Sequence, residues 1–574
     1  MAIIDELNQE LQKIFDKLNY NSRELAYFLY SNRPDLGDFQ TNCAMSLGKQ
    51  LKTSPLGIAR IIGEELKKSD KISLVSADGP GFINIKISER HLLNYLNKIM
   101  NSPKCGLEHG GEKKTVVADY GGFNIAKELH VGHLRPAVIG DSIRRIYEFA
   151  GDRVIGDVHL GDWGLNMGMT IQGIKLKYPG LKCFQNGFDG EKIDDLNITS
   201  ADLTELYKLA NAKAKEDKAF MDEVRLATKR LQDGFKPHRA LWKYFKEICV
   251  KDLQELVCDT LDIHFDLWNG ESDSGDTITQ IIRNLMRTGQ IIISDGAKII
   301  DLAEYGLPPL IMEKSDGAAL YASSDVATVL DRVQKYNPDL ILYVMDFRQE
   351  LHIKQVFAAC EKINILNREK NKLLFCPFGT VNGEDGKPYK TRSGENVKLR
   401  SLVEEVTEKI AQKTAAGDES ALKNIAGACI KFADLINHRE SSYILNTEQF
   451  TNYDGKTGAY LLYGIVRINS ILQNQEIFDY NITEVRAPEE RDLMVELSKF
   501  NLYFEMAYDK QSPNIIAEYV FELIKKFSAF YAKCPINSEK DLAYRRSKIS
   551  LLTLTKKIAE TCLYLLGIKT VERM

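Results

Sequence analysis

The sequence His130-Val131-Gly132-His133 combines residue types that could act on a nucleotide phosphate. Two imidazoles can donate hydrogen bonds to a crowded, negatively charged phosphorus centre, and Gly132 lets a nucleotide approach the backbone. The motif stands after an expected strand and at the start of an expected helix, whose N-terminal dipole also favours phosphate. A short motif of this kind also arises by chance on a capped helix, so alone it leaves both interpretations open.

A second group with phosphate chemistry lies in the glycine- and lysine-rich loop 383–394, which follows another expected strand. Lys387, Lys390 and Arg392 could close over a triphosphate and offset the charge that develops on pyrophosphate. Taken alone, the loop is better explained as the solvated tip of a basic hairpin. Two such loops, each after a strand of one sheet, are much less expected by chance, and together they favour a nucleotide site.

The elements around these motifs predict a doubly wound parallel sheet, that is, a Rossmann-like α/β fold. A short buried strand at 115–118 is followed by a helix with apolar residues at helical spacing, which Gly151 ends, and then by a strand at 154–158. Further strand-like segments are expected at 291–293, 340–344 and 373–378.

The 574 residues are enough for three or four folded units, and three are expected. Residues 1–110 have the pattern of an α+β unit that closes with a turn and an alternating, half-exposed strand at 82–87. Residues 111–412 contain the sheet, with a long, charged helical insertion at about 180–295. Residues 424–574 are almost entirely helical and predict an all-α bundle.

Composition and charge exclude several classes of protein. With 76 basic and 80 acidic residues, the net charge of −4 gives no overall sign of a nucleic-acid partner, although such a sum hides any local basic surface. No apolar run approaches the ~18 residues that cross a bilayer, and the amino terminus lacks the pattern of a secretory signal. The ten cysteines are scattered singly, which argues against a zinc ribbon and fits a reducing cytoplasm.

Several segments resemble the class I arginyl-tRNA synthetases of bacterial type, and they run essentially from end to end of the chain. These segments are 37–42, 79–84, 124–135, 159–164, 387–394 and 571–574. The resemblance implies ATP-dependent activation of L-arginine to arginyl-adenylate, with release of pyrophosphate, and transfer of the arginyl group to the 3′ end of tRNA(Arg), with release of AMP. It further implies that the first step needs bound tRNA.

The same resemblance implies Mg²⁺ as the companion of ATP. No carboxylate cluster dedicated to the metal is evident in the sequence, so no metal ligand is assigned. A cytoplasmic monomer without membrane contact is expected.

The resemblance assigns contacts with ATP to the signature turn. His130 and His133 match the two signature histidines, with Gly132 between them, and Lys127 lies just upstream. Together with Arg392, the residues Lys127, His130 and His133 are expected to take part in catalysis.

Residues 387–394 resemble a degenerate KMSKS loop, in which Lys390, Thr391 and Arg392 are expected to bind ATP. Thr391 stands where the second lysine of that motif is expected. In families with this replacement a lysine at the place of Lys127 is thought to supply the missing charge, which is reasonable because a charge acts by its distance from the phosphate. Arg392 remains to contact the leaving pyrophosphate.

A guanidinium is planar, always charged and carries five N–H donors, so its pocket should offer carboxylates and a phenol. Asp119 ends the first strand, and Tyr321 and Asp325 are four residues apart, one turn if that segment is helical. Taken singly, a core tyrosine and a helix cap explain the latter two as well. The resemblance implies that arginine is bound by Asp119, Asn124, His133, Tyr321, Asp325 and Gln349.

Basic and aromatic residues of the last unit could bind RNA. Positive charge is concentrated in 533–557, and Tyr460, Tyr463 and Arg467 share a helical face. A solvated helix face and core tyrosines are the alternative explanation. The resemblance implies an anticodon-binding domain here and an additional tRNA-binding domain at 1–110, with contacts from Phe82, Asn84, Lys86, Tyr460, Tyr463, Arg467, Arg545, Arg546 and Met574.

Two other functions stay open at this stage. A class I synthetase for another amino acid would share the signature, but the residues expected to recognise arginine argue against it. A non-catalytic tRNA-binding paralogue would keep the RNA-binding units, but the intact catalytic residues argue against that function.

Overall fold

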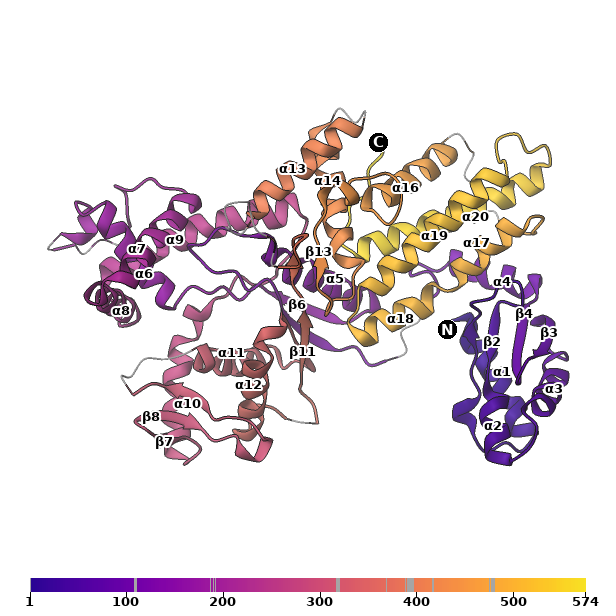
Figure 1. The fold of residues 1–574 in the computed structure, drawn as a ribbon, viewed down its shortest axis with the longest axis horizontal. Helices are drawn as coiled ribbons and strands as arrows, with labels where there is room; N and C mark the ends of the chain where they lie inside the picture. The colour runs from indigo at the N-terminus through magenta and orange to yellow at the C-terminus, as the bar shows by residue number, and fades with distance from the viewer. Residues whose placement is uncertain are drawn as a thin grey trace. The chain divides into compact units, whose positions relative to one another are not determined.

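The computed structural model describes the chain apart from a few residues. Those left out are 1, 108–110, 186, 189, 191, 316–320, 368, 388, 390–396, 415–417, 474 and 476–480, together with the side chains of Asp276 and Tyr321. The chain forms two compact units (Figure 1). The first consists of Met1–Gly111, Tyr453–Leu565 and Thr570–Met574, and the second of Glu112–Asn452 and Leu566–Lys569.

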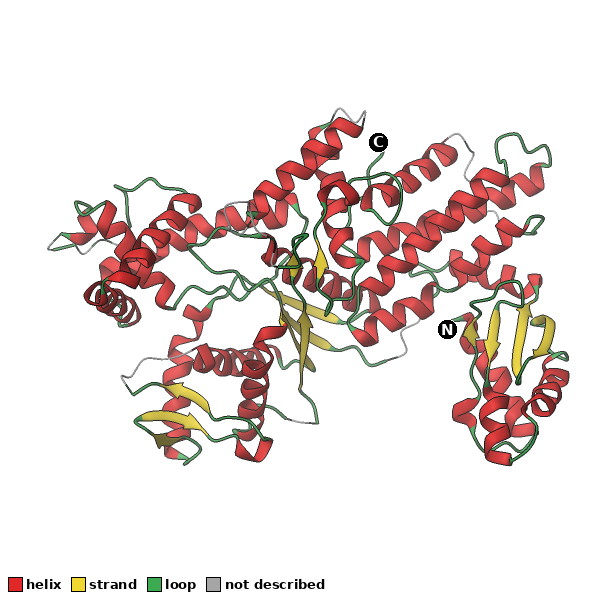
Figure 2. Cartoon of the chain, in the orientation of Figure 1, coloured by secondary structure: helices red, strands yellow, loops and turns green. Residues whose placement is uncertain are grey.

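The second unit is built on a four-stranded sheet in which every pair is parallel (Figure 2). Its strands stand in the order β11 (Lys372–Phe378), β10 (Leu340–Asp346), β5 (Thr115–Asp119) and β6 (Arg153–Asp157). Helix α5 (Leu134–Ala150) crosses from β5 to β6, and Gly151 ends it with a φ of 112°. Val116, Val117 and Ile341 are fully buried, as strands covered on both faces require. The expected parallel α/β sheet is confirmed.

The strand expected at 291–293 is present but belongs to a different sheet. Three antiparallel strands form that sheet: β7 (Ile292–Ser294), β8 (Ala297–Ile300) and β9 (Leu310–Glu313). Asp295 and Gly296 close the first hairpin with φ angles of 49° and 77°, the conformation that a two-residue turn of this type requires. The segment therefore does not extend the parallel sheet, because its turn joins it to the strand that follows.

The charged segment after β6 is helical, as expected. It contains α6 (Leu165–Lys177), α7 (Ser200–Glu216), α8 (Lys218–Gln232) and α9 (Lys236–Leu253), followed by a π-helical turn at Gln254–Thr260. Met169, Ala210, Phe220 and Val224 form a hydrophobic cluster within these helices. We call α6 to α9, residues 165–253, the helical insertion; it starts and ends earlier than the expected range of about 180–295, and this cluster is its core.

The remaining elements of the second unit complete the walls of the sheet. They are α10 (Gly275–Arg287), α11 (Tyr321–Tyr336), α12 (Glu350–Lys362), α13 (Leu399–Lys413), α14 (Glu419–Leu435), α15 (Thr447–Phe450), and the parallel pair β12 (Val381–Asn382) and β13 (Tyr443–Ile444). One large hydrophobic core joins α10, α11 and α12 to β5, β6 and β10. Among the described residues, none of the helices has both the length and the apolar character to cross a membrane.

The first unit combines an antiparallel sheet with helices from both ends of the sequence. The sheet has the order β1 (Leu29–Tyr30), β2 (Phe39–Thr41), β4 (Phe82–Ile87) and β3 (Ile72–Asp78). Its helices are α1 (Ile3–Lys17), α2 (Cys43–Leu51), α3 (Pro55–Leu66), α4 (Glu89–Met100), α16 (Gly458–Gln473), α17 (Pro488–Ser498), α18 (Phe500–Lys510), α19 (Asn514–Lys533) and α20 (Leu542–Leu565).

Strand β4 differs from the half-exposed strand expected at 82–87. It pairs with β2 on one side and β3 on the other, and α2 and α3 pack on it. Ile83, Asn84 and Ile85 are consequently all fully buried. The alternation in the sequence marks the strand correctly but not the exposure of its second face, which depends on what packs there.

Candidate active site

A cavity of about 810 Å³ opens in the second unit at the carboxyl ends of the parallel strands. Ligands of open α/β sheets bind at this edge, where strand ends and helix N-termini meet. The segments after β5, β6, β10 and β11 all line the cavity, as does the start of α5. The expected site residues that line it together are Asp119, Asn124, His130, Gly132, His133, Asp325 and Gln349.

The two signature imidazoles accept hydrogen bonds from the backbone of their own turn. The His130 N–H donates to Nδ1 of His133 at 3.1 Å, and the Gly132 N–H donates to Nδ1 of His130 at 3.1 Å. The rings stack with their centroids 3.8 Å apart. Because Nδ1 accepts in both rings, each neutral imidazole carries its proton on Nε2, from which it can be donated to a ligand. A Cβ at residue 132 would lie 2.9 Å from the His130 ring, which explains the glycine.

Both imidazoles are neutral at neutral pH. Burial, and then the charges of His130 and Lys127, lowers the pKa of His133 to about 3. Burial, and then the charge of Lys127, also lowers the pKa of His130. The pair can therefore donate hydrogen bonds to a phosphate but brings no positive charge to it. Such charge has to come from other residues.

The signature turn pairs with the chain on the carboxyl side of the basic loop 383–394. The Val131 N–H donates to the carbonyl oxygen of Val397 at 2.9 Å, and the Leu399 N–H donates to that of Leu129 at 2.9 Å. These bonds hold the start of α13 against the turn. The segment that follows the second motif, residues 397–399, is therefore joined to the signature turn by backbone hydrogen bonds next to the cavity.

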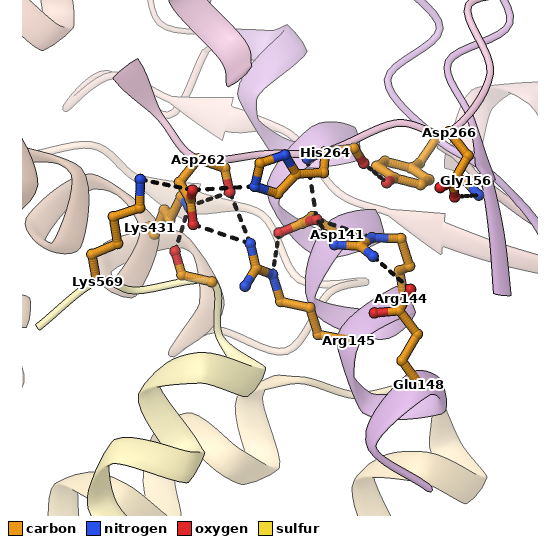
Figure 3. A network of polar contacts seen from close by, with 12 residues as sticks. Asp141, Arg144, Arg145, Glu148, Gly156, Asp262, His264, Asp266, Lys431 and Lys569 are labelled. Atoms are coloured by element: carbon orange, nitrogen blue, oxygen red, sulfur yellow. Dashed lines mark hydrogen bonds and ion pairs between the residues drawn. The ribbon is translucent and has the colours of Figure 1, made fainter. Parts of the chain in front are cut away.

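Helix α5 is anchored by a network of charged residues beyond the signature turn (Figure 3). Asp141 accepts hydrogen bonds from Arg144 at 3.0 Å and Arg145 at 2.7 Å, and Arg145 also bonds the carboxylate of Asp262 at 3.1 Å. Lys431, whose pKa burial lowers to about 8, donates to the carbonyl oxygen of Asp262 at 3.3 Å. The network therefore ties α5 to the loop that follows the helical insertion.

The same loop supports the signature turn through aromatic rings. Phe265 stacks on Tyr120 with centroids 4.7 Å apart and meets Phe123 edge-on at 6.1 Å. Phe123 meets the ring of His133 edge-on, also at 6.1 Å. A packed aromatic group therefore fixes the orientation of this imidazole.

Four carboxylates line the same cavity: Asp119, Glu271, Asp325 and Asp346, the last of which is paired with Arg348. Asp119 is buried and accepts a hydrogen bond from Arg332 at 2.6 Å, but the same guanidinium also bonds Asp157 at 2.7 Å, so two carboxylates share one cation. Asp325, on α11, is hydrogen-bonded to Nε2 of His352 at 2.6 Å. This bond to Asp325 raises the pKa of His352.

Glu271 is a candidate that sequence reasoning missed. Burial, and then the charges of Asp325 and Asp162, raises its pKa to about 8. A bridge between Leu160 and Gly270 brings this residue to the cavity. No local pattern distinguishes it from the other acidic residues of its segment, because only the tertiary fold brings it close to Asp325. A cation bound here would favour its charged form.

The two expected amides, Asn124 and Gln349, both line the cavity. Asn124 follows β5, and its backbone forms a β-bridge with Gly161. A Cβ added at Gly161 would lie 2.6 Å from the side-chain amide oxygen of Asn124. Gln349 ends the short turn Phe347–Gln349, directly before α12. Gln355, six residues further along the chain on α12, donates to the carbonyl oxygen of Pro308 at 2.9 Å.

Some expected residues are not part of the described cavity. Lys390, Thr391 and Arg392 lie outside the described residues. The side chain of Tyr321 is also outside them, although its backbone begins α11 one turn before Asp325, as expected. Lys127 is not among the residues that line the cavity, and its Nζ lies 4.7 Å from the centre of the Tyr207 ring on α7.

Among the expected RNA contacts in the first unit, Tyr463 and Arg467 lie together on α16. The Arg467 guanidinium donates to the Tyr463 hydroxyl at 2.9 Å and lies 5.0 Å from the centre of the Tyr531 ring. Tyr463 and Tyr531 are 39% and 40% exposed, so this group is open to a partner. Tyr531 was missed because it reaches Arg467 only through the packing of α16 on α19. Tyr460 is half-buried, and its hydroxyl bonds that of Ser528.

Two lysines of the basic stretch 533–557 and one expected contact, Asn84, face inward instead. Lys548 is buried and donates to Glu539 at 2.9 Å, while Lys557 donates to two carbonyl oxygens at the end of α4. The basic stretch 533–557 is therefore not one exposed stripe, since some of its lysines stabilise the unit itself. Asn84 is buried as well, and its side chain bonds neighbouring strands.

The other expected RNA contacts are more accessible. Lys86 and Arg546 are exposed, and Phe82 and Met574 are half-buried. Arg545 is half-buried and donates to the side chain of Gln475 at 2.9 Å.

Comparison with known proteins gives matches along the whole chain. Residues 96–447 match the family model described as tRNA synthetases class I (R), catalytic domain. Residues 461–574 match the DALR anticodon binding domain, and residues 1–87 match the arginyl tRNA synthetase N terminal domain.

Full-length relatives and a solved structure agree with these models. Arginine–tRNA ligases from Alkaliphilus oremlandii and Francisella tularensis subsp. holarctica are 39% and 40% identical to this chain, with all of both chains covered. The crystal structure of arginyl-tRNA synthetase from Plasmodium falciparum superposes with a TM-score of 0.81 at 26% identity, covering 100% of this chain and 99% of that one. With a matched catalytic domain, a cavity at the expected sheet edge and relatives of this identity, the chain belongs to the arginyl-tRNA synthetase family of class I aminoacyl-tRNA synthetases.

Proposed function

We propose that the cavity of the second unit binds ATP and L-arginine together and forms arginyl-adenylate, which then reacts with tRNA(Arg). One observation carries this proposal. A single cavity combines neutral imidazole donors at a helix N-terminus with buried carboxylates that lack a full complement of cations. The first group suits a phosphate, and the second suits a guanidinium.

On the ATP side, His130 and His133 donate from Nε2 to phosphate oxygens, and Gly132 leaves room for the nucleotide. Lys390, Thr391 and Arg392 close over the triphosphate, and Arg392 contacts the departing pyrophosphate. Lys127 adds the positive charge that the neutral imidazoles do not supply. The spacing of these residues, and the bonds that join the signature turn to residues 397–399 directly after the basic loop, support this assignment.

On the arginine side, Asp325, Tyr321 and Glu271 receive the guanidinium, while Asn124 and Gln349 hold the α-amino end. Asp119, which lines the same cavity and is bonded to Arg332, also contributes to arginine binding. Loss of a proton from Glu271 as the cation binds would balance charge inside a buried site. His352 lines the same pocket, and the hydrogen bond of its Nε2 orients the Asp325 carboxylate.

The reaction needs no protein nucleophile. The arginine carboxylate attacks the α-phosphate in line, pyrophosphate leaves, and the terminal ribose hydroxyl of the tRNA later takes the arginyl group as AMP leaves. The residues act by holding the reactants in line and by stabilising the charge that develops on phosphate. As the sequence resemblance implies, the first step requires bound tRNA.

Mg²⁺ is proposed to enter bound to ATP. In such sites the phosphate oxygens of the substrate commonly supply much of its coordination. Over the described part of the chain, no group of three or more His, Cys, Asp or Glu side chains could hold a metal ion by itself. No step above depends on the metal.

The tRNA is proposed to contact all three parts of the chain: 1–110, the catalytic part 111–412 with its insertion at about 180–295, and 424–574. Phe82 and Lys86 contribute from the first part. The group of Tyr463, Arg467 and Tyr531 in the last part suits stacking and phosphate contacts with unpaired anticodon bases. We propose that the protein is cytoplasmic and that it is a monomer. Light scattering would test the second property by giving the mass of one chain.

The test of this function is aminoacylation of total tRNA with each labelled amino acid in turn. The expected result is charging with arginine alone, dependent on ATP. Charging with another amino acid would identify a different class I synthetase, and tRNA binding without charging would identify a non-catalytic paralogue. Pyrophosphate exchange that runs equally well without tRNA would refute the requirement for tRNA in the first step.

A further inference from the structure

The backbone on both sides of Lys127 is held by the helical insertion. The N–H of Ala126 donates to Sγ of Cys249, on α9, at 3.4 Å, and the N–H of Glu128 donates to the hydroxyl of Thr204, on α7, at 2.9 Å. Ala126 has a φ of 64°, a left-handed conformation that residues with a Cβ seldom adopt. The insertion therefore stabilises an unusual turn of the chain directly before the signature.

The side chain of Lys127 meets the insertion as well. Its Nζ lies 4.7 Å from the centre of the Tyr207 ring, within the range of a cation–π contact. Tyr207 follows Thr204 by three residues on α7, so both side chains lie on one face of that helix. The ring is half-buried and packs on the core of the insertion, which limits its movement.

The place of this ammonium matters because the signature imidazoles are neutral. Burial is the largest cause of the lowered pKa of both rings, and His130 adds to it for His133. The charge of Lys127 then lowers the pKa of both rings further. The ammonium therefore lies within electrostatic reach of the turn that would contact ATP. A lysine side chain is long and flexible, so without a fixed partner its charge is spread over many positions.

We propose that Tyr207 is a positioning residue for the activation step: its ring holds the Lys127 ammonium beside the signature turn. This gives the helical insertion a part in catalysis beyond its own packing. The inference rests on the proposed role of Lys127 at the phosphates of ATP. Thr204 and Cys249 hold the backbone, and Tyr207 holds the charge.

The test uses the full chain and tRNA-dependent ATP–pyrophosphate exchange, with kcat and the KM values for ATP and arginine measured separately. Tyr207→Leu removes the ring and should lower kcat about three- to thirtyfold, the range expected for losing a partly buried cation–π contact. The KM for arginine should not change. Tyr207→Phe keeps the ring and should stay within about twofold of the original enzyme.

Two comparisons separate positioning from general stability. In a double-mutant cycle, Tyr207→Leu should cost nothing further once Lys127→Met is present. Tyr178→Leu is the matched control, since it removes a ring 5.4 Å from Lys177 at the end of α6, in the same insertion. This control should leave kcat unchanged.

A graded series covers the case in which Tyr207→Leu does not fold. Phenylalanines with increasing fluorination at position 207 keep the shape of the ring while weakening its negative face, so kcat should fall stepwise with fluorine content. A flat series would overturn the proposal, as would an equal loss from Tyr207→Leu with and without Lys127. Full activity of Lys127→Met would refute the role of Lys127 itself. If Lys127→Met loses activity while Tyr207→Leu has a normal kcat, only the role of the ring is refuted.

Discussion

Replacing Glu271 by glutamine should change how arginine binding depends on pH. In the original protein the pKa of this carboxyl is raised to about 8, through burial and then Asp325 and Asp162. The bound guanidinium requires the charged form, so one proton must leave on binding below that pH. Since one pH unit corresponds to a factor of ten, arginine affinity should rise about tenfold per unit up to about pH 8 and then level off.

The glutamine variant resembles the protonated carboxyl in size and has no proton to lose. Its arginine affinity should match that of the original protein near pH 6 and fall below it by about tenfold or more near pH 8.5. The hydrogen bond to Asp325 raises the pKa of His352, so His352→Gln is measured in parallel to remove its contribution.

Calorimetry in buffers of different ionisation enthalpy provides the assay, because it reports both the affinity and the number of protons released. About one proton should be released near neutral pH by the original protein and none by Glu271→Gln. If both proteins had the same pH slope and the same proton release, Glu271 would not be the titrating carboxyl, and its place beside the guanidinium would be refuted.

Two further perturbations follow from the same geometry. Asp325→Ala should raise the KM for arginine by well over tenfold, because losing one partner of a buried charged pair costs about 2–5 kcal/mol; steady-state charging at varied arginine measures it, and an unchanged KM would remove Asp325 from the pocket. Arg332→Leu should lower the free energy of unfolding by about 3–5 kcal/mol, because two buried aspartates lose their shared partner at 2.6 and 2.7 Å. Urea unfolding of the two proteins measures this change, and a difference below about 1 kcal/mol would mean that water or rearrangement replaces the lost arginine.

Much of the fold could be predicted because its signals are local. The apolar spacing of α5, its stop at Gly151 and the short apolar strands on either side are properties of neighbouring residues, and together they predict a parallel sheet. The segment 291–293 shows the limit of this reasoning. Its strand character is local, but which sheet it joins depends on pairing, and here the Asp295-Gly296 turn directs it to β8.

Exposure was less predictable than secondary structure for a similar reason. The alternating pattern of β4 is correct, yet Asn84 on the face expected to be exposed is buried because neighbouring strands bond it, while Lys86 is exposed. Lys548 and Lys557 contribute to a basic stretch in the sequence, but their side chains are used inside the first unit. A sequence lists charges in order and does not state which of them solvent reaches.

The sequence by itself determined the signature turn, the place of its histidines at the start of a helix and, through resemblance, the family. These properties reside in a few consecutive residues, whose hydrogen bonds close within the turn. Only the tertiary structure decided that Glu271 lies near Asp325, that Arg332 bonds both Asp119 and Asp157, and that Tyr207 meets Lys127. Each of these is a contact between distant segments, and the strength of charge interactions depends on distance and burial in space, which the order of residues along the chain does not contain.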